Sequence, residues 1–185
     1  MRTWPGMPYD KQLKNKRDFY NSLAEGNKAA DLFVDAAVKK GYAVVRSSKW
    51  QDINEHWDYM IQKKYPSQKG VRAYKVEVKA MKRIEYQDRE PQAELIWIEL
   101  HGVRERDQGW LNGKADLIAF EQSDHFIVVR RKKLKGLVEY LASTKKVSRT
   151  SEALYCLYSR KGRNDQLTMI RNRDILKIKF KIWRK

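Results

Sequence analysis

The segment Ala73–Arg83, AYKVEVKAMKR, is the stretch around which the rest of the sequence is organised. Its composition is typical of a buried strand, and successive side chains of a strand point to opposite faces. Glu77 and Lys79 therefore share one face, while Val76 and Val78 share the other. The sequence predicts a carboxylate and an ammonium group at one point of a strand.

A second strand is predicted just upstream, in His56–Lys64, HWDYMIQKK, and it carries Asp58. The turn-forming segment Pro66–Gly70 separates the two apolar runs, a pattern that favours a β-hairpin. Asp58 then lies on one arm and Glu77 on the other. Two carboxylates are expected to converge beside Lys79.

This group of side chains has a chemistry that the residue types suggest. Hard divalent cations such as Mg²⁺ prefer oxygen ligands, so Asp58, Glu77 and the main-chain carbonyl of Val78 form a candidate metal site. Lys79 would orient or deprotonate an attacking water. The metal, Mg²⁺ or Mn²⁺, would stabilise the charge that develops on a phosphate.

Asp58 followed by Glu77-Val78-Lys79 resembles the active-site signature of the PD-(D/E)XK nuclease superfamily, which includes many restriction enzymes and Holliday-junction resolvases. The resemblance extends from about Leu23 to Arg131, and Trp57 stands where many members have proline. Three further segments, VEVKAMKR, WIELHGVR and GWLNGKADLIAFE, are similar to small nuclease-like proteins of tailed phages.

The resemblance implies an α/β fold with a restriction-endonuclease-like core, in which helices flank a mixed central β-sheet. It implies a Mg²⁺-dependent DNA endonuclease, structure-selective for junctions or flaps, with Asp58, Glu77 and Lys79 as catalytic residues. Members commonly carry an acidic residue on the first helix. A non-catalytic nucleic-acid-binding protein on the same scaffold is the alternative.

Composition supports a nucleic-acid partner. The chain has 185 residues, 40 Lys and Arg against 23 Asp and Glu, and a formal net charge of +17. A basic excess of this size favours a polyanion, most often nucleic acid, and the alternative is a soluble basic protein or one drawn to anionic membranes. The resemblance makes DNA the expected partner. The length fits one domain, with residues 1–16 as a flexible basic segment and residues 17–185 as the nuclease-like domain. A homodimer is compatible with this length.

Several other classes of protein are disfavoured. The single Cys156 permits no intramolecular disulfide and no thiolate zinc cluster, and is expected in the core. The three histidines do not form a zinc-hydrolase motif, although His56 would border the metal site, and no phosphate-binding glycine motif is present. No apolar stretch has the length of a membrane span, and the first residues lack the apolar segment of a signal peptide, so a cytoplasmic protein is expected, in its own cell or in a host.

The first helix is predicted over Asp18–Lys39, followed by a strand at Tyr42–Arg46. Three acidic residues of this helix are candidates for the site. Helical geometry places Asp31 at the border of the apolar stripe, whereas Glu25 and Asp35 project nearly opposite to it. For Asp31 an ordinary solvated helix acid is at least an equal alternative. The stripe itself is assigned to Leu23, Ala30, Phe33, Val34 and Ala37.

Downstream, strands are predicted at Ala93–Val103, Ala115–Glu121 and His125–Arg131. Glu99 is an auxiliary ligand or, preferably, an ion-pair partner, and Asp116 is a reserve ligand or, preferably, a structural strand-end residue. The candidate nucleic-acid contacts are basic residues and one aromatic residue, from a loop at Arg104–Lys114, from the end of the Ala73–Arg83 segment and from the basic cluster that opens the next helix: Lys82, Arg83, Arg104, Arg106, Trp110, Arg130, Arg131, Lys132 and Lys133. For Trp110, burial as a core plug is an equal alternative.

The C-terminal third is predicted to hold a helix opening at Arg130–Lys135, a buried strand in Leu154–Ser159 and its partner in Leu167–Ile170. The last strand, Ile175–Trp183, alternates apolar and basic residues. Its predicted inward face consists of Leu176, Ile178, Phe180 and Ile182.

Overall fold

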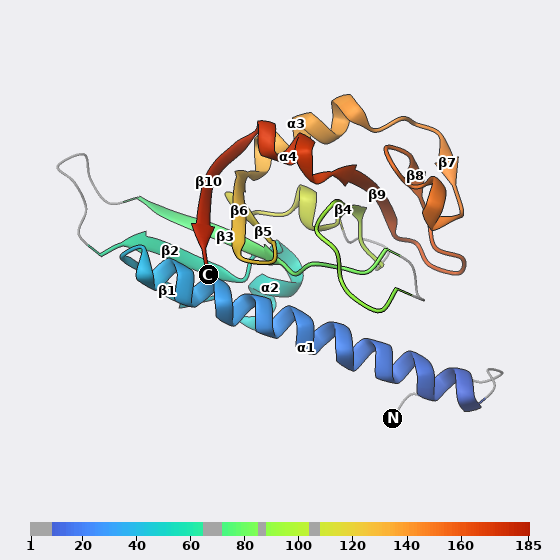
Figure 1. The fold of residues 1–185 in the computed structure, drawn as a ribbon, viewed down its shortest axis with the longest axis horizontal. Helices are drawn as coiled ribbons and strands as arrows, with labels where there is room; N and C mark the ends of the chain where they lie inside the picture. The colour runs from blue at the N-terminus through green and yellow to red at the C-terminus, as the bar shows by residue number, and fades with distance from the viewer. Residues whose placement is uncertain (1–8, 65–71, 85–87, 104–107) are drawn as a thin grey trace.

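The computed structural model describes residues 9–64, 72–84, 88–103 and 108–185, and for residues 9–19 the backbone alone. Within these ranges the chain is a mixed α/β protein with two mixed β-sheets and four α-helices (Figure 1). The predicted α/β class is confirmed.

The larger sheet contains the predicted hairpin at its centre. β3 pairs antiparallel with β2 and parallel with β5, and every other neighbouring pair is antiparallel. The six strands follow in spatial order: β1 (Tyr42–Arg46), β2 (Tyr59–Lys63), β3 (Ala73–Lys79), β5 (Leu117–Glu121), β6 (His125–Arg130) and β10 (Lys179–Arg184).

The second sheet has four strands, which lie to the right in Figure 1. In spatial order they are β4 (Leu95–His101), β9 (Gln166–Arg171), β8 (Leu157–Tyr158) and β7 (Lys146–Val147). β4 was predicted as a strand, and the structure assigns it to this second sheet.

The helices divide between the two faces of the larger sheet. The long helix α1 (Tyr9–Lys39) runs along one face, and α3 (Arg131–Leu141) covers the other. The remaining helical segments are short connections: α2 (Lys49–Glu55), α4 (Asn172–Lys177), and the 3₁₀ turns η1 (Trp110–Asn112) and η2 (Thr150–Glu152).

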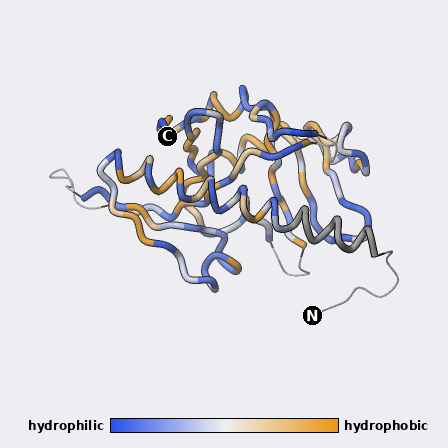
Figure 2. The backbone as a smooth tube through the Cα atoms, turned by 60° about the horizontal axis from the view of Figure 1, so that its bottom comes forward, coloured by the Kyte–Doolittle hydropathy of each residue, from blue (hydrophilic) through white to orange (hydrophobic). Residues whose placement is uncertain are grey.

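Alternation along the strands separates two hydrophobic clusters. Leu117 and Ala119 of β5 pack with Phe33 of α1, whereas Ile118 and Phe120 pack on the α3 side. Hydrophobic residues recur between hydrophilic ones along the described part of α1 (Figure 2), as expected for a helix with one buried face.

The same alternation orients β3. Val76 and Val78 belong to the α1 side of the sheet, so Glu77 and Lys79 project to the α3 side. The prediction that these two charged residues share a face is confirmed.

The predicted boundaries of three helix and strand segments are wrong. α1 begins at Tyr9, inside the segment predicted to be flexible. Asp58 lies just before β2, because α2, which was not predicted, fills the connection from β1. In Leu154–Ser159 only two residues form a strand, because Tyr155 has a positive φ of 56°.

The predicted C-terminal strand is also wrong in extent and phase. Its first part belongs to α4, and β10 begins at Lys179 with a register shift against β6 before Lys181. The shift places Trp183 in the core and leaves Ile182 46% exposed. A bulge changes which face a side chain occupies, and strict alternation cannot anticipate it.

At Gly113, directly after η1, the backbone passes very close to the end of α2. A Cβ at this position would lie 2.7 Å from the Cβ of His56 and 2.8 Å from the carbonyl oxygen of Glu55. The amide of the next residue, Lys114, donates to that same carbonyl at 2.6 Å. Only glycine fits this approach without displacing the backbone that leads to Asp58.

Gly113→Ala should therefore lower the free energy of unfolding by about 1–3 kcal/mol, the usual cost of overpacking. Urea denaturation followed by circular dichroism measures it. Gly136→Ala in α3 is the matched control, because no heavy atom lies within 4 Å of its Cβ. This control should raise stability by about 0.5–1 kcal/mol through helix propensity, and equal effects of the two variants would contradict the packing argument.

Candidate active site

Asp58 is placed by the end of α2. Ser48 begins this helix with a capping box, and His56 ends it in the left-handed conformation at φ 54°. The chain then turns into the sheet, where the amide of Asp58 donates to the Val76 carbonyl at 2.8 Å. Its Oδ2 accepts from the Val78 amide at 2.6 Å. Asp58 is therefore attached to β3 through both main chain and side chain.

A buried glutamate fixes this junction, and sequence reasoning missed it. Glu55 accepts hydrogen bonds from Trp57 Nε1 at 2.8 Å, Lys114 Nζ at 2.8 Å and Lys75 Nζ at 3.2 Å. The bonds from Lys114 and Trp57 lower the pKa of Glu55 to about 2. Trp57, the residue directly before Asp58, is 2% exposed and is thus anchored in the core.

Glu77 and Lys79 form a close ion pair on the α3 side of β3. Lys79 Nζ donates to Glu77 Oε1 at 2.5 Å and lies 5.0 Å from the centre of the Trp110 ring. Glu77 is only 5% exposed. Its second oxygen, Oε2, is buried and has no hydrogen-bond partner among the described residues. Burial has therefore removed Oε2 from water, and no hydrogen bond within the described residues replaces the lost hydration.

Burial and neighbouring charges shift the pKa values of the site. Burial, reinforced by the charge of Glu77, raises the pKa of Asp58 to about 7, against an ordinary value of 3.8. Burial also raises the pKa of Glu77, although Lys79 opposes it. For Lys79 burial disfavours the charge, but Glu77 and Asp58 outweigh burial and raise the pKa of the ammonium.

The two reserve ligands differ in position. Glu99 on β4 is close enough for its charge to act on Glu77 and on Lys79, so it belongs to the surroundings of the site. Asp116 instead makes two hydrogen bonds to the backbone of Lys75. Its Oδ2 accepts from the Lys75 amide at 2.9 Å, and its own amide donates to the Lys75 carbonyl at 2.8 Å. Its preferred role as a structural strand-end residue is confirmed.

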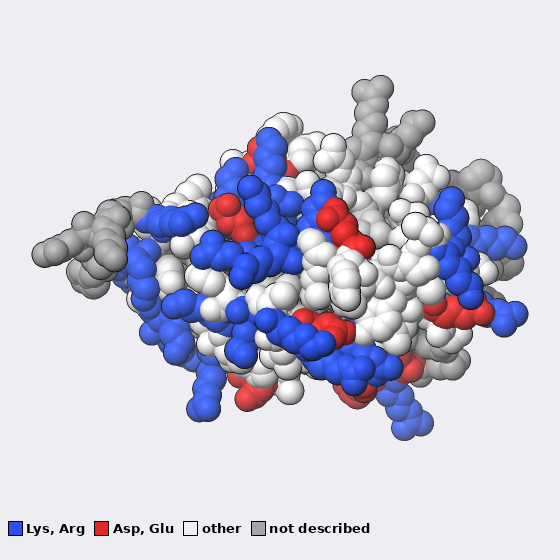
Figure 3. All heavy atoms as spheres, turned by 90° about the horizontal axis from the view of Figure 1, so that it is seen from above, with Lys and Arg blue, Asp and Glu red and all other residues white. Residues whose placement is uncertain are grey.

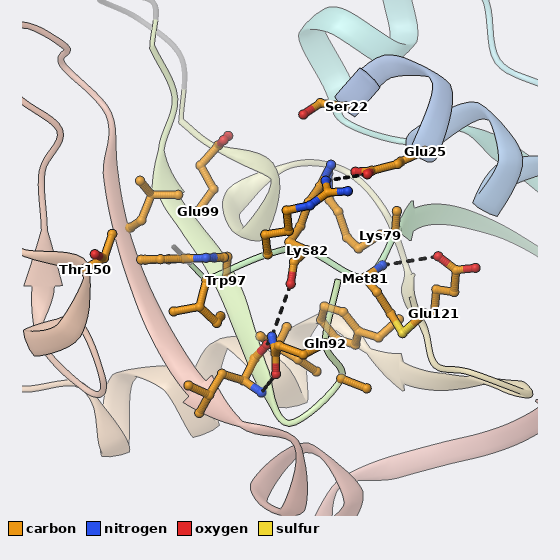
Figure 4. A pocket seen from close by; sticks show the side chains of 18 of the residues that line it. Ser22, Glu25, Lys79, Met81, Lys82, Gln92, Trp97, Glu99, Glu121 and Thr150 are labelled. Atoms are coloured by element: carbon orange, nitrogen blue, oxygen red, sulfur yellow. Dashed lines mark hydrogen bonds and ion pairs between the residues drawn. The ribbon is translucent and has the colours of Figure 1, made fainter. Parts of the chain in front are cut away.

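A cavity of about 870 Å³ opens beside Lys79 (Figure 4). It lies beyond the carboxyl ends of the parallel pair β3 and β5, and α1 and β4 contribute to its walls. Asp58 and Glu77 are not part of its lining, so Lys79 connects the carboxylates to the cavity.

The acidic residue that α1 contributes to this cavity is Glu25, which was expected to project away from the buried face, and Asp31 is the ordinary solvated helix acid of the alternative. Glu25 lines the cavity and pairs with Arg83 at 2.5 Å, whereas Asp31 is exposed. The predicted stripe included Leu23, which is 50% exposed. The buried residues are Ala29, Phe33, Ala36 and Ala37, and Glu25 lies one turn before Ala29 on the same line.

Two of the candidate nucleic-acid contacts have structural roles instead. Trp110 is 5% exposed and packs against Phe120, so the core-plug alternative is the right one. Arg131 donates to the carbonyl of Ala115 at 2.6 Å and to that of Leu111 at 3.0 Å, which ties α3 to η1.

The remaining candidates fall into three groups. Lys82 and Arg83 line the cavity. Lys132 and Lys133 are exposed on α3, and Arg130 lies over the Phe180 ring at 4.5 Å. Arg104 and Arg106, like the predicted turn Pro66–Gly70, lie outside the described residues.

The face formed by α3 and α4 is strongly basic. Figure 3 looks down on the side where these helices lie in Figure 1, and Lys and Arg side chains gather over it, with acidic side chains interspersed among them. Exposed basic residues of these helices include Lys132, Lys133, Arg173 and Lys177. Glu77 and Lys79 project toward the same side of the sheet.

Comparison of the chain with protein-family models, with curated proteins and with solved structures finds no match. In the described part of the chain, no helix is both long and apolar enough to cross a membrane.

The raised pKa of Asp58 predicts an unusual dependence of stability on pH in the metal-free protein. The native state keeps a proton that the unfolded chain releases above about pH 4, so the free energy of unfolding should fall as the pH rises from about 4 to 7. Asp58→Asn removes the titrating group, so its stability relative to wild type should increase as the pH rises through this range. The difference should reach up to about 4 kcal/mol at pH 8, where it is complete.

Urea denaturation of both proteins in chelator, from pH 5 to pH 8, measures the difference. Asp124→Asn is the control: a hydrogen bond from His125 lowers the pKa of Asp124, so this carboxylate is ionised in the native and unfolded states throughout this range. Its removal should lower stability by an amount that does not follow the pH profile expected for Asp58. A difference between wild type and Asp58→Asn that stays constant with pH would contradict the assignment.

Proposed function

We propose that this protein is a divalent-metal-dependent nuclease that hydrolyses phosphodiester bonds in DNA. The observation that carries the proposal is Glu77 Oε2, a buried carboxylate oxygen without a hydrogen-bond partner among the described residues, next to Asp58 and Lys79. Two desolvated carboxylates, both with raised pKa and one of them raised further by the charge of the other, form a poor structural pair. They are suited to a shared cation.

The donor set fits Mg²⁺ or Mn²⁺. Among the described residues no three His, Cys, Asp or Glu side chains gather to hold a metal by themselves, so water and a main-chain carbonyl would complete the ligands. Val78 supplies the carbonyl: its amide points to Asp58, and the amide and carbonyl of a strand residue point to the same side. Asp58, Glu77 and Val78 would thus hold the ion, as the sequence suggested.

Such an ion would offset the charge of both carboxylates and stabilise the charge that develops on the phosphate. The chain's own contribution is Lys79. The ring of Trp110 lies beneath its ammonium, and Glu77 orients it. Burial lowers the pKa of this lysine once the carboxylate charge no longer outweighs it. Lys79 is therefore placed to orient a water or accept its proton beside the cavity.

Two further features support the proposal. Apart from the short helix α2 between β1 and β2, the order α1, β1, β2, β3, with Asp58 and Glu77 at the hairpin, agrees with the core expected from the likeness to PD-(D/E)XK nucleases. The basic face of α3 and α4 offers a surface for the phosphates of DNA. A cytoplasmic location and a possible homodimer are part of the same hypothesis.

Three substitutions should separate metal binding from catalysis. Asp58→Asn and Glu77→Gln should each weaken Mn²⁺ binding at least about tenfold and reduce DNA cleavage with it, because each removes a ligand charge. Lys79→Met should keep Mn²⁺ binding and lose at least about 100-fold in cleavage rate, because it removes the group that handles the water. Calorimetric titration of Mn²⁺ and gel assays of DNA cleavage measure both quantities.

Lys63→Met is the control, because this exposed lysine at the end of β2 is remote from the carboxylates in the chain's topology. It should change neither quantity. DNA binding without cleavage of any DNA, with either metal, would instead support the non-catalytic alternative, and equal Mn²⁺ affinity of wild type and Asp58→Asn would exclude Asp58 as a ligand.

The basic face predicts a change in salt dependence. Replacing Lys132 and Lys133 by Gln should weaken binding about equally on all DNA sequences, and should reduce the slope of log affinity against log salt by about 2 if each lysine contacts one phosphate. Fluorescence anisotropy at several salt concentrations measures the slope. Lys39→Gln with Lys40→Gln, at the end of α1 on the other layer, removes equal charge and should change it less. Equal slopes for the two double variants would show that α3 does not face the DNA.

A further inference from the structure

The cavity beside Lys79 has features that the hydrolysis of a phosphodiester does not require. Its volume of about 870 Å³ lies within the range of small-molecule binding sites. Its lining belongs to segments far apart in sequence, from α1 to β9. A ligand of nucleotide size fits here and would touch the same lysine that acts at the carboxylates.

One wall of the cavity is a braced aromatic ring. Trp97 of β4 stands at the cavity (Figure 4), and the ring of Tyr158 supports it at 5.4 Å between centroids and an angle of 41°. The β4–β9 ladder, in which Trp97 lies opposite Met169, holds its backbone. A flat ring fixed in this way offers a stacking platform without a large loss of side-chain entropy.

Most charged groups at the cavity are neutralised by partners, and burial lowers the pKa of Lys82, a further cation in its lining. Arg83 is paired with Glu25, and the guanidinium of Arg160 is paired with the buried Asp165. Glu99 adds a carboxylate near Trp97. A phosphate cradle would present an excess of positive charge, so this cavity suits a flat, neutral and partly polar ring better than a phosphate.

We propose that this cavity binds an unpaired nucleobase, stacked on Trp97, next to the phosphodiester at Lys79. Bases inside a duplex are stacked on their neighbours and cannot enter, so the protein should favour DNA with an extruded or single-stranded nucleotide over perfectly paired DNA. The place of the cut relative to this base rests on the proposed nuclease function, whereas the binding of the base does not.

The test compares two DNA hairpins of equal length in chelator, one fully paired and one with a single unpaired 2-aminopurine. Stacking on an aromatic side chain strengthens binding by about 5- to 150-fold per base. Wild type should bind the bulged hairpin tighter by a factor in this range and quench the 2-aminopurine fluorescence. Equal affinity for both hairpins overturns the proposal.

The variants assign the effect to the cavity. Trp97→Ala should bring the affinity ratio close to one and abolish the quench, while Trp50→Ala, at a tryptophan of α2 that is 63% exposed, should change neither. Thr150→Trp leaves Trp97 in place and fills the cavity that Thr150 lines, so it should also remove the preference. A ratio unchanged in a folded Trp97→Ala or in Thr150→Trp overturns the proposal.

Two further measurements complete the test. The first distinguishes a base within DNA from a free nucleotide as the ligand, and the second distinguishes the base-binding proposal from the proposed nuclease function. Free 2-aminopurine ribonucleoside monophosphate should compete poorly, and competition as strong as that of the bulged hairpin would make the cavity a mononucleotide site instead. Adding Mn²⁺ reports cleavage separately. A preference for the bulge without any cleavage contradicts the nuclease function alone, and cleavage without any preference contradicts the base-binding site alone.

Discussion

The rest of the structure depends on one constraint: strand β3 holds two charged side chains, Glu77 and Lys79, inside the protein. The strand is hydrogen-bonded to β2 on one side and to β5 on the other. Its Val76 and Val78 pack toward α1, which forces Glu77 and Lys79 into the opposite layer. A lone carboxylate there would be strongly destabilising, and the ion pair with Lys79 offsets only one of its oxygens.

The surroundings of β3 are consistent with holding this charged group in one geometry. Glu55 collects three donors at the end of α2 and sets the position of Trp57, from which Asp58 follows directly. On the other side, η1 places Trp110 under the ammonium of Lys79, and Arg131 ties η1 to α3. Stability and site geometry thus depend on the same contacts. A buried polar group with few alternatives for its partners restricts the fold to one arrangement.

The proposed chemistry and the proposed recognition meet at Lys79. Toward the sheet this side chain contacts a carboxylate with raised pKa, and in the other direction it lines a cavity with an aromatic wall. A nuclease that uses such an arrangement would select its substrate by local unpairing rather than by reading base edges in a groove. The basic face of α3 and α4 would then contribute affinity that is independent of sequence.

The sequence by itself determined the hairpin, the shared face of Glu77 and Lys79, and the place of Asp58 beside them. Strand alternation and turn composition are local properties, and a tripeptide with one charged face expresses them directly. The same local rules misplaced Glu25, which was expected to project away from the buried face, and the phase of β10. Leu23 continues the apolar pattern of α1 but is exposed, and the bulge in β10 depends on its pairing with β6. Only the tertiary structure decided that Trp110 is buried, that Glu55 gathers its three donors and that Glu25 and Trp97 share a cavity. These arrangements join residues far apart in the chain, and their contacts form only when the two sheets and α1 pack together.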